Sequence, residues 1–453
     1  MSCWWGIFLA HRKNQENILF DFFTQTPQQK KATNEIDFYP THVNFGDAVQ
    51  TFHIGLGSMA VPGNIKGVFE VHKKLGKLPL NVVAEPAIHY AEHGLEINDF
   101  QAYCLQLLKP IIFASPEARI IYAPNGNLKK SGEILILKDL AASLKNLVAM
   151  GEEYFYAGDI AEKIIQDCRE HGGYLTREDL QNYRVINRKP LTINYRDYTI
   201  ITNPPPSAGG ILIAFSLGLL SSISFTGIKF GDRKHLQILA EVMHLTNQAR
   251  ENEYHQVCPG ELSANHNLQF YQQKLNNVVN KWGSTTHISV MDGEGNAASV
   301  TTSNGEGSGY MIPGTGIMMN NMLGEADLNP NGFHQWQDNQ RISSMMSPTI
   351  LLKNGHPEIV LGSGGSNRIR TAILQVISNL VDWQMPITDA ITSPRCHWEN
   401  YQFDIEPGFD LNDLATLRLP NNTKSRLWQE KICFWGCTWS SKNSEWDDIR
   451  GRG

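Results

Sequence analysis

A change of pattern near residue 284 constrains the fold of this chain more than any other stretch. Gly283 and Ser284 follow a polar, weakly patterned run, and from there polar and apolar side chains alternate over residues 285–290. A glycine-rich turn at residues 292–296 comes next, and the alternation resumes over residues 297–302. Two alternating runs around such a turn predict a β-hairpin.

This hairpin begins with a hydroxyl residue, Thr285, directly after the flexible Gly283-Ser284 pair. A self-cleaving precursor needs such an arrangement. If the Ser284–Thr285 bond were cut, Thr285 would become an N-terminal threonine. Its hydroxyl would then be a nucleophile, with its own α-amine as the adjacent base. The alternative is an ordinary Thr-rich strand, and these residues alone favour it, because short motifs often match by chance.

The length and charge of the chain exclude some classes of function. Its 453 residues are enough for more than one domain or for one large enzyme core. A net charge of -6 indicates no polyanionic partner such as nucleic acid. We expect no membrane span, since no run of 18 apolar residues is present.

The N-terminal and cysteine patterns favour a cytoplasmic protein. The apolar run at residues 3–10 lacks a basic segment before it and a small-residue cleavage site after it, so it predicts a buried strand rather than a signal peptide. The seven cysteines are scattered and odd in number, which fits reduced thiols. Cys433 and Cys437 could bind zinc, but without a second pair we interpret them as unrelated thiols and expect no metal.

The remaining pattern predicts an α+β layered sandwich, because helices come first, then strands, then one long helix. The expected helices are residues 67–75, 79–94, 140–150 (with Asp139 as cap), 157–171, one opening at Ile211, 235–250 and 368–381, with Thr176 as a further N-cap. The expected strands are residues 18–23, 191–202 and the hairpin 349–361 around Asn354-Gly355.

Three Gly/Ser-rich segments follow Thr285 at strand ends, where sites are built. They are residues 302–309, 341–348 and 362–368. Each by itself is more often a turn. The third runs into a predicted helix start, so its backbone N–H groups converge and form a candidate oxyanion hole. It lacks the lysine and the spacing of a phosphate-binding loop.

Taken together, these segments resemble the γ-glutamyltranspeptidase family of N-terminal-nucleophile hydrolases. The order and spacing agree from about residue 18 to residue 398. The segments that support the resemblance are residues 172–180, 204–210, 285–290, 320–325, 343–349 and 362–369.

The resemblance implies a four-layer αββα sandwich made from one precursor that is cut into a large part, 1–284, and a small part, 285–453. Thr285 would cut the bond after Ser284 and then attack a γ-glutamyl amide such as glutathione. Water, an amino acid or a peptide amine would take the γ-glutamyl group from the enzyme. No cofactor is implied, and the two parts would stay together as a heterodimer.

The resemblance also implies roles for individual residues. Thr302 matches the second hydroxyl that hydrogen-bonds the nucleophile, and Ser303 stays open as an alternative because the alignment needs a one-residue gap there. The remaining matches are Asn304 and Glu325 for the substrate's α-amino group, Ser343 and Ser344 for its α-carboxylate, and Gly364 and Gly365 for the oxyanion hole.

Two departures from the family bear on function. Phe23 stands where the family usually has an arginine that grips the α-carboxylate, so that bidentate clamp is lost, although Arg341 or Arg368 could supply charge. This leaves open a related amidase for another acyl group, such as a β-lactam side chain or a poly-γ-glutamate, or an unprocessed inactive homologue. The start is also short relative to the family, and a truncated N-terminus would permit a periplasmic or secreted protein.

Overall fold

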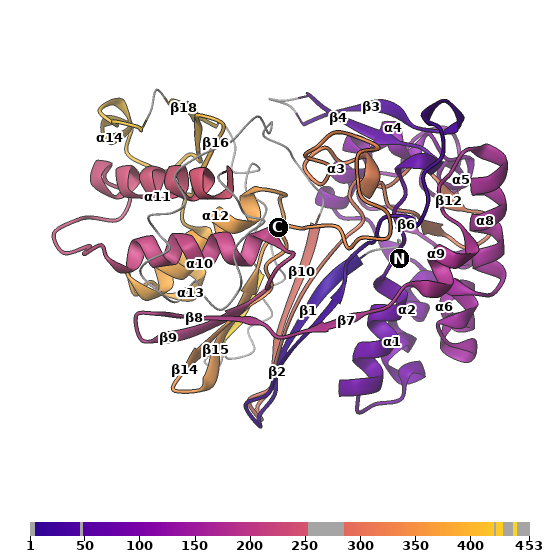
Figure 1. Ribbon diagram of the computed structural model, residues 1–453, viewed down its shortest axis with the longest axis horizontal. Coiled ribbons are helices and arrows are strands. Elements are labelled where there is room, and N and C mark those ends of the chain that lie inside the picture. Colours follow the sequence, from indigo (N-terminus) through magenta and orange to yellow (C-terminus); the bar gives the residue numbers. More distant parts are fainter. Residues whose placement is uncertain (1–4, 46–48, 252–284, 421–422, 429–437, 442–453) are drawn as a thin grey trace. The chain divides into compact units, whose positions relative to one another are not determined.

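The computed structural model describes residues 5–45, 49–251, 285–420, 423–428 and 438–441 (Figure 1). The residues that the structure describes divide into two compact units. Unit 1 comprises Met1–Gly6, Phe20–Asn187 and Thr302–Ile342, and unit 2 comprises Ile7–Leu19, Arg188–Thr301 and Ser343–Gly453. Each unit therefore takes segments from both sides of Thr285.

One five-stranded sheet contains the predicted hairpin and the predicted N-terminal strand. Its order is β10 (Thr285–Met291), β11 (Ala297–Ser303), β1 (Trp5–His11), β2 (Asn17–Phe22) and β7 (Ile186–Arg188). Both predictions are confirmed. A half-buried strand usually turns its apolar side chains to the core. In β10 the apolar Ile288 and Val290 are exposed, whereas the polar His287 is buried.

The second five-stranded sheet lies within unit 2 and has the order β19 (Thr438–Ser441), β15, β14, β9 and β8. The predicted hairpin around Asn354-Gly355 is confirmed as β14 (Thr349–Lys353) and β15 (His356–Gly362). The prediction of one strand over residues 191–202 is wrong. The chain turns at Arg196, which has a φ of 53°, and forms the antiparallel pair β8 (Leu191–Tyr195) and β9 (Tyr198–Thr202).

Helices α10 (Ala208–Ser221) and α12 (Arg368–Val381) pack against this sheet (Figure 1). Helix α12 has the predicted bounds and is buried around almost its whole circumference. Strand β10 also contacts β15 and β19. The helices, the sheet and β10 therefore form three successive layers inside unit 2. Its other elements are α11 (Arg233–Glu251), α13 (Ile387–Thr392), β16 (Cys396–Glu399), β17 (Gln402–Ile405), α14 (Leu411–Ala415), β18 (Lys424–Leu427) and β19 (Thr438–Ser441).

Unit 1 is mainly helical, and an apolar core within it combines residues of α6, α7, α8 and α9 with residues of 56–65 and 312–319. Its helices are α1 (Asn64–Leu75), α2 (Leu80–His93), α3 (Asp99–Leu107), α4 (Lys109–Ile112), α5 (Pro116–Tyr122), α6 (Lys138–Met150), α7 (Glu153–Tyr156), α8 (Asp159–His171) and α9 (Arg177–Asn182). Its short strands are β3 (Tyr39–Asn44), β4 (Val49–Ile54), β5 (Leu95–Glu96), β6 (Ile134–Leu135), β12 (Met311–Ile312) and β13 (Ile317–Met318).

Most predicted helix ends lie within two residues of those in the structure, but α1 begins at Asn64 rather than at residue 67, and α10 begins at Ala208 rather than at Ile211. A predicted cap and a predicted apolar face were also tested. Thr176 forms the predicted N-cap, as part of a capping box with Asp179. Asp139 does not cap α6, because the helix already begins at Lys138. The predicted apolar face of α2 included Val83, whose side chain is 54% exposed. No helix in the described ranges is long and apolar enough to cross a bilayer.

Candidate active site

Thr285 is the first residue of β10 and lies against the third Gly/Ser-rich segment. A Cβ atom added to Gly364 would lie 2.6 Å from the carbonyl oxygen of Thr285 and 3.2 Å from its Cβ. Such distances leave no room for a side chain, so only glycine permits this approach. The hypothetical nucleophile and the first predicted oxyanion-hole glycine are therefore neighbours in unit 2. Ser284 lies outside the described residues.

The segment after β15 turns sharply into α12. Gly365 has a φ of 110°, which favours glycine, and the Gly365 carbonyl accepts the first hydrogen bond of the helix from Arg368 N at 3.0 Å. Ser363 is buried and donates its hydroxyl to Gly364 O at 2.9 Å. The loop beside Thr285 is thus the N-terminus of a 14-residue helix, where N–H groups and the helix dipole favour negative charge.

His287 is a residue whose role the sequence did not reveal. Its Nδ1 lies 2.7 Å from Thr301 Oγ1 and its Nε2 lies 3.1 Å from Ser289 Oγ. A Cβ on Gly362 would lie 2.2 Å from the imidazole ring, so the ring packs directly on β15. Burial lowers the pKa of His287 to about 3. A neutral imidazole therefore holds β10 against β15, two residues from Thr285.

Strand β11 turns the two candidate hydroxyls to opposite faces. Thr301 faces His287, which also lies within 3.4 Å of Ser299 Oγ. Because side chains alternate along a strand, Ser303 shares this face of β11 and Thr302 lies on the other. In β10, the same alternation places Thr285 on the face of His287. Ser303 is buried, and its Oγ accepts a hydrogen bond from Gly305 N at 3.1 Å.

Ser343 and Ser344 lie beside the segment at residues 204–210, in unit 2. Ser343 is exposed and donates its hydroxyl to Pro206 O at 2.7 Å. Ser344 is buried, and its carbonyl accepts from Ser207 Oγ at 2.7 Å and from Ala208 N at 2.8 Å. The Ser344 carbonyl thus satisfies donors at the start of α10. Two segments that are far apart in the sequence are brought together here.

Asn304 and Glu325 are brought together in unit 1, around Gly305. A Cβ on Gly305 would lie 2.8 Å from Glu325 Oε1 and 2.1 Å from Asn321 Oδ1. Glu325 is buried, and the buried Oδ1 of Asn304 accepts no hydrogen bond from any described residue. The carboxylate beside Gly305 and the amide oxygen of the residue before it are both groups that can accept from an ammonium group.

The position expected for the family arginine is closed in this chain. Phe23 is only 2% exposed. Arg341 donates to the Phe23 carbonyl, to Tyr183 Oη and, at 2.7 Å, to Arg184 O. Its Nη1 also lies 3.7 Å from Asp21 Oδ1. The guanidinium of Arg341 is thus occupied by protein groups of unit 1.

The predicted site residues are therefore grouped within each unit. Unit 2 contains Thr285, Gly364, Gly365, Ser343 and Ser344. The residues of unit 1 are Thr302, Ser303, Asn304 and Glu325. Among the residues that the structure describes, no group of three or more His, Cys, Asp or Glu side chains is placed to hold a metal ion. Cys433 and Cys437 lie outside those residues.

Comparison with known proteins identifies the family. The family model described as gamma-glutamyltranspeptidase matches residues 6–425. The chain belongs to the gamma-glutamyltranspeptidase family. This family member is 30% identical to the glutathione hydrolase proenzyme of Escherichia coli, over 91% of this chain and 76% of that protein. It is 31% identical to an acylase proenzyme of a Pseudomonas species, over 78% of this chain and 66% of that protein.

A solved structure shares the fold of this family member. The crystal structure of a cephalosporin acylase from Bacillus halodurans superposes with a TM-score of 0.80 at 23% identity, over 96% of this chain and 82% of that one. At 23% identity this similarity shows the fold alone. The fold combines helices and sheets, as the sequence predicted.

Proposed function

We propose that this chain is a self-processing threonine hydrolase and acyltransferase that acts on γ-glutamyl amides such as glutathione. The observation that carries the proposal is the placement of Thr285 against Gly364, at the N-terminus of α12. A hydroxyl at the head of a strand, beside convergent N–H groups, has both a nucleophile and a site for a developing oxyanion.

Processing would start when Thr285 Oγ attacks the carbonyl carbon of Ser284. The C–N bond breaks, the nitrogen takes a proton, and an ester between Ser284 and Thr285 Oγ forms. Water then hydrolyses the ester, which leaves a carboxylate on Ser284 and a free α-amine on Thr285. We propose the parts 1–284 and 285–453 as the two products, within the four-layer αββα arrangement of the family.

Turnover would use the same groups. The α-amine of Thr285 takes the proton of its hydroxyl, and Oγ attacks the γ-carbonyl of the substrate. The N–H groups of Gly364 and Gly365 stabilise the oxyanion, and the leaving amine receives the proton. Water or an acceptor amine then removes the γ-glutamyl group from Thr285. No cofactor takes part in this scheme.

Substrate recognition would divide between the two ends of the γ-glutamyl group. Asn304 and Glu325 would hold its α-amino group, since Glu325 Oε1 lies beside Gly305 and the Oδ1 of Asn304, the residue before it, is a buried acceptor. Ser343 and Ser344 would contact its α-carboxylate. For the hydroxyl that orients the nucleophile, alternation along β11 supports Ser303 over Thr302.

A second candidate is a related amidase that acts on another acyl group. The observation that favours it is the buried Phe23 at the position of the family arginine, together with an Arg341 that already donates to Phe23 O and Arg184 O. The name of the Pseudomonas relative, an acylase proenzyme, is in line with this candidate.

Intact mass under denaturing conditions tests the proposal, with Thr285→Ala as the control. Wild-type protein should give two fragments, one of which begins at Thr285, and the variant should stay whole. The processed protein is then offered a γ-glutamyl anilide and a series of other acyl anilides. Turnover of the first supports the γ-glutamyl assignment, and turnover of the others alone supports the second candidate. A folded wild type that stays uncut would identify an inactive homologue.

A further inference from the structure

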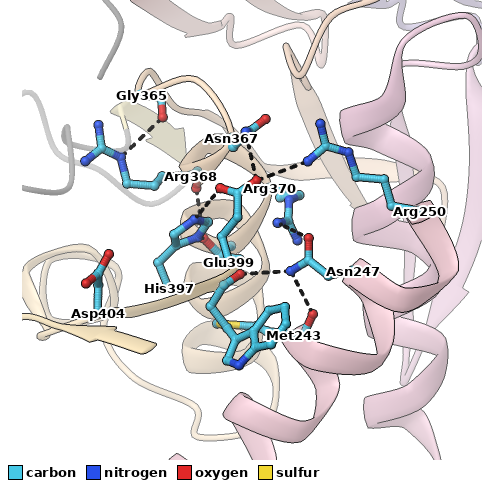
Figure 2. A network of polar contacts seen from close by, with 12 residues as sticks. Met243, Asn247, Arg250, Gly365, Asn367, Arg368, Arg370, His397, Glu399 and Asp404 are labelled. Atoms are coloured by element: carbon cyan, nitrogen blue, oxygen red, sulfur yellow. Dashed lines mark hydrogen bonds and ion pairs between the residues drawn. The ribbon is translucent and has the colours of Figure 1, made fainter. Parts of the chain in front are cut away.

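Asn367 precedes α12 but directs its side chain away from the helix. No side-chain cap bond forms at this N-cap position. Instead, Asn367 Nδ2 donates to Glu399 Oε1 at 2.9 Å, as Figure 2 shows. Asn367 is 2% exposed and comes two residues after Gly365 in the loop that lies against Thr285. The loop is therefore tied to a buried carboxylate at the end of β16.

Glu399 is surrounded by donors from three elements. Arg250 Nη1 on α11 lies 3.2 Å from Glu399 Oε1, and His397 Nε2 lies 3.1 Å from Glu399 Oε2. Burial by itself would raise the pKa of Glu399, but the hydrogen bond from His397 and the charge of Arg250 outweigh it and lower that pKa. Glu399 is therefore ionised and accepts from α11, β16 and the Gly-rich loop together.

His397 serves as a neutral donor in this network. Burial lowers its pKa, against the opposing effect of the Glu399 carboxylate. A carboxylate can only accept, so Nε2 carries a proton, and Nδ1 lies 2.8 Å from Thr371 Oγ1. A further contact links α12 to α11, since Arg370 Nη2 on α12 donates to Asn247 Oδ1 on α11 at 2.9 Å (Figure 2).

We propose that Glu399 is a positioning residue for the oxyanion loop, acting through Asn367. This inference rests on the proposed function. An oxyanion hole works only if its N–H groups are held within a fraction of an ångström, and hydrogen bonds from behind the loop supply that restraint. The competing explanation is that Glu399 only stabilises the fold, as a buried ion pair does when both partners are present.

The chain offers a matched control for the competing explanation. Glu406 is 1% exposed and follows β17, which pairs with β16. Its Oε2 accepts from Arg395 N at 2.9 Å and lies 3.8 Å from Arg395 Nε. It is thus a buried carboxylate paired with an arginine at the same small sheet. Loss of Glu406 should lower stability in the same way as loss of Glu399.

The test compares Glu399→Leu, Glu399→Gln, Asn367→Ala and Glu406→Leu in processed full-length protein, with a γ-glutamyl anilide as substrate. Active sites are counted from the burst of released aniline, and thermal unfolding is measured for each variant. Glu399→Leu should lower kcat by about 10- to 100-fold with KM changed by less than about threefold. Glu399→Gln keeps an acceptor for Asn367 and should retain more of kcat. Glu406→Leu should lower the unfolding temperature but leave kcat unchanged.

A double-mutant cycle supplies the second readout. Because Glu399→Leu and Asn367→Ala break one contact, the pair should lower kcat hardly more than either change alone. Independent, multiplicative losses would overturn the inference, as would equal kcat for the Glu399 and Glu406 variants. If the leucine variants fail to fold, Asn367→Ala is compared with Glu406→Gln, and a kcat as high in Asn367→Ala as in Glu406→Gln would overturn the inference. A processed wild type without turnover would overturn the proposed function and this inference together.

Discussion

Neighbouring residues on β11 differ in surroundings because a strand turns consecutive side chains to opposite faces. Thr301 contacts His287 at 2.7 Å, and Ser303 shares the face of Thr301. The sequence match alone pointed to Thr302 and left Ser303 open. The decision between the two hydroxyls therefore depends on strand geometry.

We expect Ser303→Ala to lower kcat by about 10- to 100-fold, because a hydrogen bond to a reacting, partly charged group contributes about 1.5–3 kcal/mol. Thr302→Ala should change kcat by less than about threefold. Steady-state rates with a γ-glutamyl anilide, corrected for the processed fraction, measure both. Restoration of most of kcat by Ser303→Thr would support the hydroxyl as the active group. A larger loss for Thr302→Ala would return the role to Thr302.

His287 should make the protein less stable in acid. Its folded-state pKa of about 3 lies below the ordinary value of 6.5, so between these values the unfolded chain binds a proton that the folded chain does not. The contribution of His287 is complete above pH 6.5 and is lost as the pH falls toward 3. The loss is at most about 1.4 kcal/mol per pH unit.

Urea unfolding at pH 7.5 and pH 5.0 measures this contribution. The free energy of unfolding of the wild type should fall from pH 7.5 to pH 5.0. In His287→Gln this fall should be about 2 kcal/mol smaller. Buried His235, whose pKa burial lowers to about 4, is unchanged in both proteins and cancels in the comparison. An identical fall in the two proteins would show that His287 titrates normally.

At the scale of elements, close contacts between segments explain why glycine is required at some positions better than backbone conformation does. Gly364 has no positive φ, yet its missing Cβ lets the loop reach Thr285. Gly209 at the start of α10 behaves in the same way, since a Cβ there would lie 2.1 Å from Met345 O. Both glycines allow two segments to approach at backbone distance.

Gly364→Ala should slow self-cleavage and lower kcat by at least about tenfold, because the loop and Thr285 must move apart by several tenths of an ångström. Gly218→Ala is the control, since nothing lies within 4 Å of that position on α10. It should leave activity unchanged and raise stability by up to about 1 kcal/mol. The rate of fragment formation by mass spectrometry and the turnover rate measure both. Normal processing in Gly364→Ala would contradict the proposed oxyanion loop.

Local patterns predicted most helices and strands, but they failed where contacts with residues far away in the sequence determine the local structure. The alternation over residues 191–202 continues through a turn with no Gly or Pro, so it indicated one strand where there are two. The turn instead places Arg196 at a positive φ, where it donates to Asp382 Oδ1 at 2.9 Å. That partner is far away in the sequence, and no local rule includes it.

At the scale of the whole molecule, the proposed cut and the compact units do not coincide. Unit 1 contains Thr302–Ile342 together with Phe20–Asn187, and unit 2 contains Arg188–Thr301 together with Ser343–Gly453. Each unit therefore combines chain from before and after Thr285. Cleavage before Thr285 would leave each unit with an internal core shared by two polypeptides.

We expect the processed fragments to stay together without denaturant, because separating them would expose the buried cores of both units to water. Size-exclusion chromatography should give one peak that contains both fragments, with the elution volume of uncut Thr285→Ala. A denaturing gel should resolve two bands from that peak. Two separate peaks under native conditions would show that the fragments do not share cores.

The sequence by itself determined the hairpin at Thr285, the N-cap at Thr176, the bounds of α12 and the family, since these depend on turn chemistry, periodicity and motif order over short spans. Only the tertiary structure decided that Gly364 meets Thr285, that Arg341 is occupied by Phe23 and Arg184 carbonyls, and that Glu399 holds Asn367. The physical reason is that such contacts form between segments far apart in the chain. Packing and burial, rather than local propensity, select them.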